Sequence, residues 1–360
     1  MPRTVVTAKD ASSIPELLTD AAALATAERW SEAAAAYDRA YRIEPEGALG
    51  EEALWGAAES FDHANQYDQA LSRYELYAQR APGTLRGRES MVRATRLLVF
   101  MGRFAQAGVY AERLLQQPQP LGDFERIAVM SARALALLER GEEQQASYFI
   151  EKARDVVESR QLDAAGRVPR DLAQLYYALG ESRRRKAERV VFDPMPANFG
   201  AVLEERCQLL LDAQSAYSDS MRAYDAHWSA MAGYRTAELY QRLHRDLLSV
   251  RPPPSADTER KRQLFEGAVR TRYAVLLTKA KGMAEHTLAM AERTGESSEW
   301  VERTRQALKS IDRGIAEEEA ALAKLPYTKA DFDAYFAQMD APATKPVPAT
   351  GAGAKPTPSR

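Results

Sequence analysis

The stretch LWGAAESFDHANQYDQALSRYELYAQRAP, residues 54–82, decides the fold, because two helical apolar patterns stand in it on either side of a turn. Its large, small and aromatic side chains recur at helical spacing, and Asn65 and Gln66 lie between the two halves. Pro82 ends the second half, since proline lacks the backbone donor that a further helical turn needs. The stretch therefore predicts a hairpin of two helices.

The same pattern occurs 37 residues earlier and 37 residues later, as the spacing of Leu17, Leu54 and Met91 shows. A fourth copy starts 39 residues after Met91, at Met130, and lacks the closing proline. Corresponding positions of the four copies are Leu17, Ala21, Leu24, Trp30, Ala33, Tyr37, Ala40 and Pro45; Leu54, Ala58, Phe61, Tyr67, Ala70, Tyr74, Tyr77 and Pro82; Met91, Thr95, Leu98, Phe104, Ala107, Ala111, Leu114 and, one place late, Pro120; and Met130, Ala134, Leu137, Gly141, Ala146, Ile150 and Ala153. A repeated hairpin of this length predicts a solenoid, in which each unit buries its apolar face against its neighbours.

The repeat ends near residue 160. A fifth copy begins at Ala173, but Arg185 and Arg189 occupy positions that should face a tight hairpin core, so we expect one helix over about 170–191 and longer helices after Pro194. The predicted fold class is all-α: a solenoid of about four hairpins continued by longer C-terminal helices. The predicted organisation is a disordered lead-in over 1–13, the solenoid over 14–160, a helical extension over 163–340 and a disordered tail rich in proline, alanine and glycine over 341–360.

Composition limits the classes of partner and compartment. The net charge is −2 and the pI is about 6.2, without the concentrated basic excess that nucleic-acid and anionic-membrane binding usually need, so we expect no nucleic-acid partner. The longest purely apolar run, 97–101, is too short to span a bilayer, so we expect no direct membrane insertion. The first residues contain no apolar run typical of a signal peptide, which predicts a cytoplasmic chain, or a periplasmic or envelope protein if a leader is missing.

The sequence shows no pattern typical of catalysis. Its four histidines lack metal-ligand spacing, and the only cysteine, Cys207, lies on an apolar stripe and is best interpreted as a core residue. We therefore expect no catalytic residue, no metal, no cofactor and no enzymatic activity. An enzyme with a helical accessory domain stays open as an alternative. The runs 183–186 (Arg-Arg-Arg-Lys) and 317–319 (Glu-Glu-Glu) are interpreted as solvated helix faces, although the first could also grip a phosphate or an acidic partner.

Residues 14–158 resemble the tetratricopeptide repeat in spacing and residue type: a large apolar residue, a small one, an aromatic or leucine, then a small–aromatic–small series and a proline. A further set of residues is similar to a bacterial family of tetratricopeptide proteins that includes a component of an adventurous gliding-motility machine, which would imply a cell-envelope scaffold. That set is Phe124-Glu125-Arg126-Ile127, Ala134, Gly141, Leu179-Gly180-Glu181, Tyr217, Trp228 and Pro252-Pro253-Pro254.

In a tetratricopeptide superhelix the first helix of each hairpin lines a concave groove, and this resemblance implies which side chains would face a partner. They are the acids, aromatics and arginines of the second and third hairpins: Trp55, Glu59, Asp62, His63, Arg93, Arg96 and Phe100. Aromatic and arginine side chains are the usual anchors of protein interfaces. The alternative is that Trp55 packs on the next repeat and the charged side chains are solvated.

These observations predict a non-enzymatic protein–protein interaction scaffold that binds a peptide or helix of a partner in the groove, alone or within a multi-protein complex. A solenoid exposes a large surface, which favours recognition of extended segments over small-molecule chemistry. The alternative is a structural subunit of an envelope or gliding-motility assembly, in which the C-terminal helices make the main contact.

Overall fold

The computed structural model describes residues 13–163 and 168–340, and the regular elements of these residues are all helices. The predicted tail over 341–360 and the lead-in before Ser13 lie outside the described residues. Ser13 starts the first helix: its hydroxyl accepts from the Glu16 backbone N–H, and the Glu16 carboxylate accepts from the Ser13 N–H at 2.9 Å. This reciprocal cap satisfies two backbone donors that the first helical turn leaves free.

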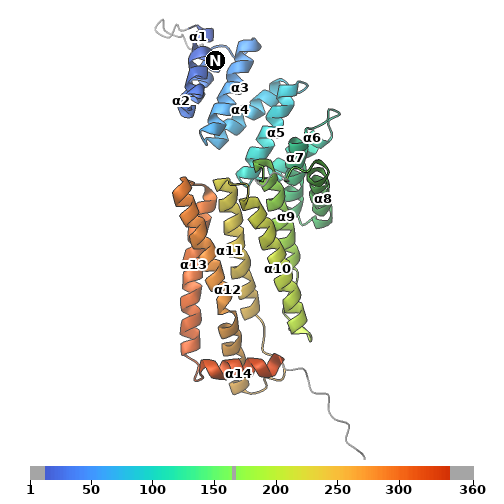
Figure 1. The fold of residues 1–360 in the computed structure, drawn as a ribbon, viewed down its shortest axis with the longest axis vertical. Coiled ribbons are helices and arrows are strands. Elements are labelled where there is room, and N and C mark those ends of the chain that lie inside the picture. The colour runs from blue at the N-terminus through green and yellow to red at the C-terminus, as the bar shows by residue number, and fades with distance from the viewer. Residues whose placement is uncertain (1–12, 164–167, 341–360) are drawn as a thin grey trace, which may run out of the picture.

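The first half of the chain forms four successive hairpins (Figure 1). Their helices are α1 (Ile14–Thr26) and α2 (Trp30–Ile43), α3 (Gly47–His63) and α4 (Tyr67–Arg80), α5 (Leu85–Phe100) and α6 (Phe104–Leu115), and α7 (Asp123–Glu139) and α8 (Glu143–Arg160). Each hairpin packs on the next through helices that are neighbours in sequence, as a solenoid requires. The predicted all-α solenoid of tetratricopeptide type is confirmed.

The four hairpins turn in the same way. One residue in each turn has a positive φ: Glu28 (57°), Asn65 (58°), Gly102 (74°) and Gly141 (78°), at the spacing of the repeat. The next residue closes the turn, as when Gln66 N–H donates to the Phe61 carbonyl oxygen at 2.9 Å. Glycine and asparagine adopt this left-handed conformation at little cost, so Glu28 is the strained copy. The turn predicted at Asn65 and Gln66 is confirmed.

Small residues let the helices approach closely. Ala33, Ala70, Ala107 and Ala146, which are equivalent in the four repeats, are fully buried. A Cβ added at Gly108 would lie only 2.3 Å from the Ala136 Cβ, so hydrogen is the only side chain that fits there. The small residues of the repeat therefore set the distance between adjacent hairpins.

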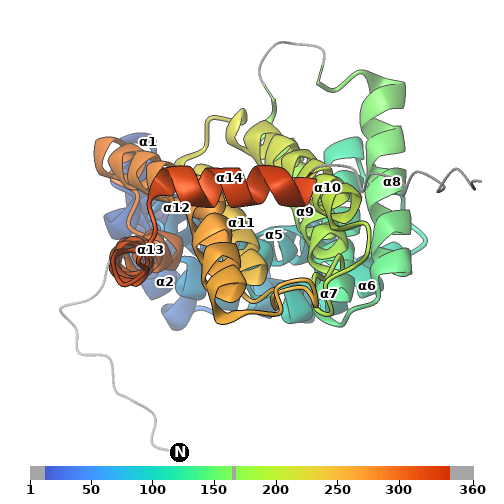
Figure 2. The ribbon, with the colours of Figure 1, turned by 90° about the horizontal axis from the view of Figure 1, so that it is seen from below.

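The second half consists of long helices that run side by side, with a short one across their far end (Figures 1 and 2). They are α9 (Arg170–Glu188), α10 (Phe199–Met221), α11 (Ala226–Leu248), α12 (Glu259–Thr294), α13 (Glu299–Ala323) and the crossing helix α14 (Lys329–Asp340). Helix α9 matches the single long helix expected over about 170–191. It packs on α7, where the buried Gln174 amide donates to the Ala128 carbonyl oxygen at 2.7 Å.

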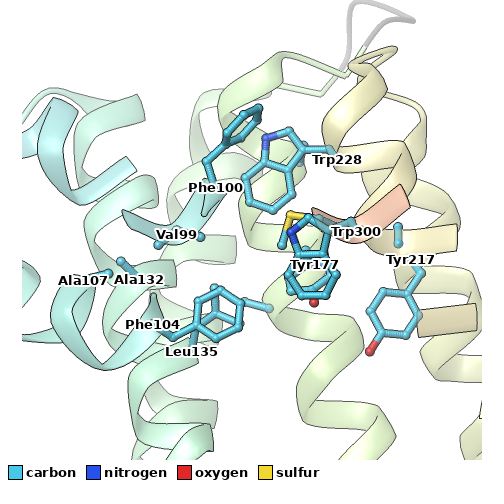
Figure 3. Packing of buried hydrophobic residues seen from close by; sticks show 14 of the residues in the cluster. Val99, Phe100, Phe104, Ala107, Ala132, Leu135, Tyr177, Tyr217, Trp228 and Trp300 are labelled. Carbon is cyan, nitrogen blue, oxygen red and sulfur yellow. The ribbon is translucent and has the colours of Figure 1, made fainter. Parts of the chain in front are cut away.

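The solenoid and this bundle share one hydrophobic core (Figure 3). Phe104 of α6 lies with its ring centroid 6.3 Å from that of Tyr177 in α9. Tyr177 is fully buried, and its ring lies 5.7 Å from both Tyr217 of α10 and Trp228 of α11. Apolar packing therefore continues without a break from the last two hairpins into the bundle, and it fixes how the two halves sit against each other.

Candidate binding site at the junction of solenoid and bundle

A cavity of ≈ 330 Å³ lies where the solenoid helices α3 and α5 meet the bundle helices α9 and α11. Four of the seven predicted groove residues line it: Asp62, Arg93, Arg96 and Phe100. The other lining residues, which the sequence did not point to, are Leu97, Arg170, Asp171, Gln174 and Trp228. The predicted concave face is thus closed on one side by the chain's own bundle.

Arg93 is held firmly on the solenoid side of this junction cavity. Its guanidinium pairs with Glu59 at 3.1 Å and with Glu89 at 3.0 Å, donates to the Tyr74 hydroxyl at 3.3 Å, and lies 5.0 Å from the Trp55 ring centroid. Burial disfavours the charged form, but Tyr74 and the two carboxylates outweigh it and raise the pKa of Arg93 above its ordinary value. Glu59 and Arg93, both predicted to face a partner, therefore form an ion pair within the chain.

Two further arginines join the solenoid to the bundle. Arg96 of α5 pairs with Asp171 of α9 at 2.8 Å, while its Nε is buried without a hydrogen-bond partner. Arg170 of α9 pairs with Asp225 at 2.8 Å and lies 5.3 Å from the Phe100 ring centroid. A buried N–H without an acceptor costs free energy, so the Arg96 Nε is a group that an incoming acceptor would satisfy.

The cavity wall contains two acids: Asp171, which pairs with Arg96, and Asp62. It is partly buried, and burial raises the pKa of its carboxyl although Arg170, His63 and Arg93 lie near enough to oppose that effect. Within the described residues its carboxylate forms no hydrogen bond and no ion pair. The cavity thus presents one carboxylate that is still free to receive a donor.

The remaining predicted groove residues lie elsewhere. Trp55 is 8% exposed and packs edge-on against Tyr74 and Tyr77 of its own hairpin, so the prediction that it stands in the groove as an anchor is wrong. The guanidinium groups of Arg86 and Arg93 of α5 lie 5.3 and 5.0 Å from its ring centroid, so the ring is enclosed between its own hairpin and the next one. His63 is exposed and stacks on Trp30 of the first hairpin, with ring centroids 4.2 Å apart.

Phe100 is also buried, and a histidine from the bundle covers it. The His227 ring stacks on Phe100 at a centroid distance of 3.5 Å, and its Nε2 lies 2.6 Å from the Phe100 carbonyl oxygen. Its Nδ1 lies 3.2 Å from the carboxylate of Glu296, in the turn before α13. Phe100 is therefore an anchor between the two halves of this chain, which corrects its predicted role as an exposed groove aromatic.

Sequence reasoning missed the contribution of α9 and α11. Arg170 and Asp171 open a helix, and Trp228 stands on an apolar stripe, but nothing in their local pattern places them opposite α5. Their position depends on how the bundle folds back onto the third hairpin. No signal short of contact information between distant segments would have identified them.

The described residues lack two kinds of feature, a metal-ion site and a membrane-spanning helix. No group of three or more histidine, cysteine or carboxylate side chains there is arranged to hold a metal ion. Of the helices that the structure describes, none is both long and apolar enough to cross a membrane.

Comparisons with known proteins give a likeness to solved structures alone. No family model matches the chain, and no curated protein matches it. One similar structure is the human IFIT1 dimer with PPP-AAAA, which shares 13% identity over 91% of this chain and 72% of that chain at a TM-score of 0.42. Another is a monomeric mutant of IFIT1 with Gppp-AAAA, which shares 14% identity over 91% of this chain and 71% of that chain at a TM-score of 0.45. The resemblance to gliding-motility proteins stays a prediction.

These two structures correct the prediction about nucleic acid. Both contain an RNA ligand, whereas the sequence analysis excluded such a partner on the ground of net charge. The exclusion does not stand, because a net charge near zero describes the whole chain and says nothing about where its cations gather.

Proposed function

We propose that this protein is a non-enzymatic interaction scaffold that binds a segment of a partner protein in the junction cavity between α3, α5, α9 and α11. The observation that carries the proposal is the free carboxylate of Asp62 in a cavity whose three arginines, Arg93, Arg96 and Arg170, are already ion-paired. A partly buried carboxylate gains most from a ligand that brings it a cation or a strong donor. The partner segment would therefore deliver a lysine or arginine side chain to Asp62.

The Nε–H of Arg96, which has no hydrogen-bond partner, offers a second contact: it donates a hydrogen bond, whereas the Asp62 carboxylate accepts one. A backbone carbonyl or an acidic side chain next to the basic residue of the partner would accept from it. Phe100, Leu97 and Trp228 add apolar surface to the same wall. The combination suits a short peptide of mixed charge, as the resemblance to tetratricopeptide proteins also implies.

The test compares Asp62→Asn with a matched control, Asp155→Asn. Both changes remove one negative charge and keep side-chain size, but Asp155 lies on α8 with its side chain 62% exposed, away from the cavity. Each tagged full-length variant and the wild type are purified from the native host after mild cross-linking. Proteins that are lost from Asp62→Asn and kept by Asp155→Asn are the expected result.

The strongest of these proteins is then produced separately, and its affinity is measured by calorimetry. Loss of a charge-assisted contact worth about 1.5–3 kcal/mol predicts a weakening of roughly tenfold to a hundredfold for Asp62→Asn. An identical set of partners with all three proteins would overturn the assignment of the cavity. Deletion of residues 199–340 would then test the alternative, in which the long helices make the main contact.

A further inference from the structure

A second cluster of charges lies in the bundle, far along the helices from the junction cavity. A crevice of ≈ 290 Å³ opens between α9, α11 and α13, and four arginines line it: Arg184, Arg242, Arg245 and Arg303. Arg184 belongs to the run 183–186, whose interpretation as a solvated face is wrong, since only Lys186 of the four is exposed. We call this place the arginine crevice.

The two carboxylates in its wall are already engaged. Glu188 accepts from Arg184 Nη1 at 2.7 Å, and Glu238 accepts from Arg235 Nη1, behind the wall, at 2.6 Å. Arg184 also pairs at 2.9 Å with the buried carboxylate of Glu181. These three carboxylates thus pair with Arg184 and Arg235 and do not neutralise the arginines on the open side of the crevice.

On the open side, positive charge exceeds negative charge. A single carboxylate, Asp246, serves two guanidinium groups: Arg242 at 3.1 Å and Arg206 at 3.0 Å. Arg206 is 2% exposed, and neither its Nε nor its Nη1 has a hydrogen-bond partner. Arg245, one helical turn from Arg242, is exposed and forms no ion pair within the described residues. Of the two arginines that α11 brings to the crevice, Arg242 therefore shares its one carboxylate with the buried Arg206, and Arg245 has no ion-pair partner among the described residues.

Arg303 completes the arrangement from the opposite helix. Its guanidinium is held 4.5 Å from the Trp300 ring centroid and pairs with Glu299, which is 68% exposed. Stacking on an aromatic face fixes the plane of the guanidinium without using its N–H donors. A preoriented arginine on α13 thus faces the two arginines of α11 across the crevice.

We propose that the arginine crevice binds a small anion that carries two or more adjacent phosphate groups. Guanidinium groups pair with phosphate oxygens through parallel N–H donors, and several arginines in one site match a ligand with several negative charges. The crevice is slightly smaller than the pockets of about 300–1,000 Å³ that take drug-sized ligands, so it suits a phosphate chain and not a large organic molecule. This inference is independent of the proposed partner site.

The experiment titrates sodium tripolyphosphate into the full-length protein by calorimetry, at constant ionic strength. The test variant carries Arg242→Ala and Arg245→Ala, two changes at exposed side chains that leave the core intact. The control is Arg305→Ala, on α13 and outside the crevice, with a side chain 55% exposed. We expect saturable binding to the wild type and the control, and affinity at least tenfold weaker in the double variant.

The conservative change Arg245→Lys and a comparison of ligands sharpen the result. Lysine keeps the positive charge but lacks the planar set of N–H donors of a guanidinium group. Arg245→Lys should therefore bind tripolyphosphate more weakly than the wild type and more tightly than the double variant. Sulfate at equal ionic strength should not compete, whereas ATP, which carries the same triphosphate, should compete if the phosphate chain is what is recognised. No saturable binding of tripolyphosphate, or equal binding by the double variant, would overturn the proposal. Circular dichroism confirms that each variant is folded.

Discussion

The imidazole Nε2 of His227 lies 2.6 Å from the backbone carbonyl oxygen of Phe100, two residues that are 127 positions apart. The other ring nitrogen, Nδ1, lies 3.2 Å from the Glu296 carboxylate. Both nitrogens of one imidazole ring are thus engaged, one by the backbone of the solenoid and one by a carboxylate of the bundle. One side chain therefore links the end of α5, the start of α11 and the turn before α13.

Replacing this histidine should loosen the junction. His227→Ala removes two hydrogen bonds and the stacking contact with Phe100, and we expect the free energy of unfolding to fall by about 2–4 kcal/mol. The control is His286→Ala on the exposed face of α12, which should change it by less than about 0.5 kcal/mol. Urea unfolding followed by circular dichroism measures both; an equal effect of the two changes would contradict a special role of His227.

The same contact predicts a loss of stability in acid. Burial would raise the pKa of Glu296, but donors from His227 and Ser298 prevail and lower it from an ordinary value of 4.5 to about 2. Because the folded-state pKa is the lower one, the stabilisation is complete above about pH 4.5 and is lost as the pH falls toward 2. The shift corresponds to at most about 3 kcal/mol.

The free energy of unfolding, measured between pH 2 and 6, tests whether stability falls in acid as predicted. In Glu296→Gln the part of the pH dependence below pH 4.5 that comes from this carboxyl should disappear, whereas Glu299→Gln, whose side chain is 68% exposed, should leave the profile unchanged. The idea fails if Glu296→Gln keeps the full slope of the wild type.

A buried ion network in the bundle should be the most sensitive polar feature of the fold. Glu181 is 4% exposed; it pairs with Arg184 and Arg235, each at 2.9 Å, and accepts from the Tyr217 hydroxyl at 2.7 Å. Burial would raise the pKa of this carboxyl, but the two arginines hold it at about 2. Glu181→Gln leaves two buried guanidinium groups without their shared anion.

We expect Glu181→Gln to lower the free energy of unfolding by about 3–5 kcal/mol. The matched change at the more exposed neighbour, Glu238→Gln, should cost about 1 kcal/mol or less. Thermal unfolding of the two variants under identical conditions measures this difference. Similar midpoints would show that the buried network contributes no more stability than the exposed pair.

A glycine sets the distance between α9 and α10. A Cβ at Gly180 would lie 2.5 Å from Cε1 of the Tyr217 ring, whose hydroxyl is committed to Glu181, so the ring cannot move aside freely. Gly180→Ala should destabilise the protein by about 1–3 kcal/mol through overpacking. Gly200→Ala, near the start of α10 with no atom within 4 Å of the added Cβ, should be neutral or stabilising. A stabilising effect of Gly180→Ala would show that the helices can separate without cost.

Local patterns predicted the solenoid in detail. The spacing of Leu54, Ala58 and Tyr74 identified three residues that are almost fully buried, and the turn predicted at Asn65 and Gln66 is present, with a positive φ at Asn65. These predictions succeeded because hairpin packing depends on residues close together in the chain. The solvated interpretation of 317–319 holds for Glu317 and Glu319, which are exposed, but not for Glu318. Glu318 is only 9% exposed and pairs at 2.8 Å with Arg270 of α12, a contact that depends on how α12 and α13 cross.

By itself the sequence determined that the chain is helical, that it forms about four hairpins of one type, and that longer helices follow. Periodicity, small residues and turn residues act within about forty positions, and they suffice for that. Only the tertiary structure decided that the bundle folds back against α5. That docking turned Phe100 toward His227, paired Arg96 with Asp171 and gathered arginines of α9, α11 and α13 in one crevice. The reason is physical: a shared apolar core sets the angle between distant helices, and that angle chooses which polar side chains meet.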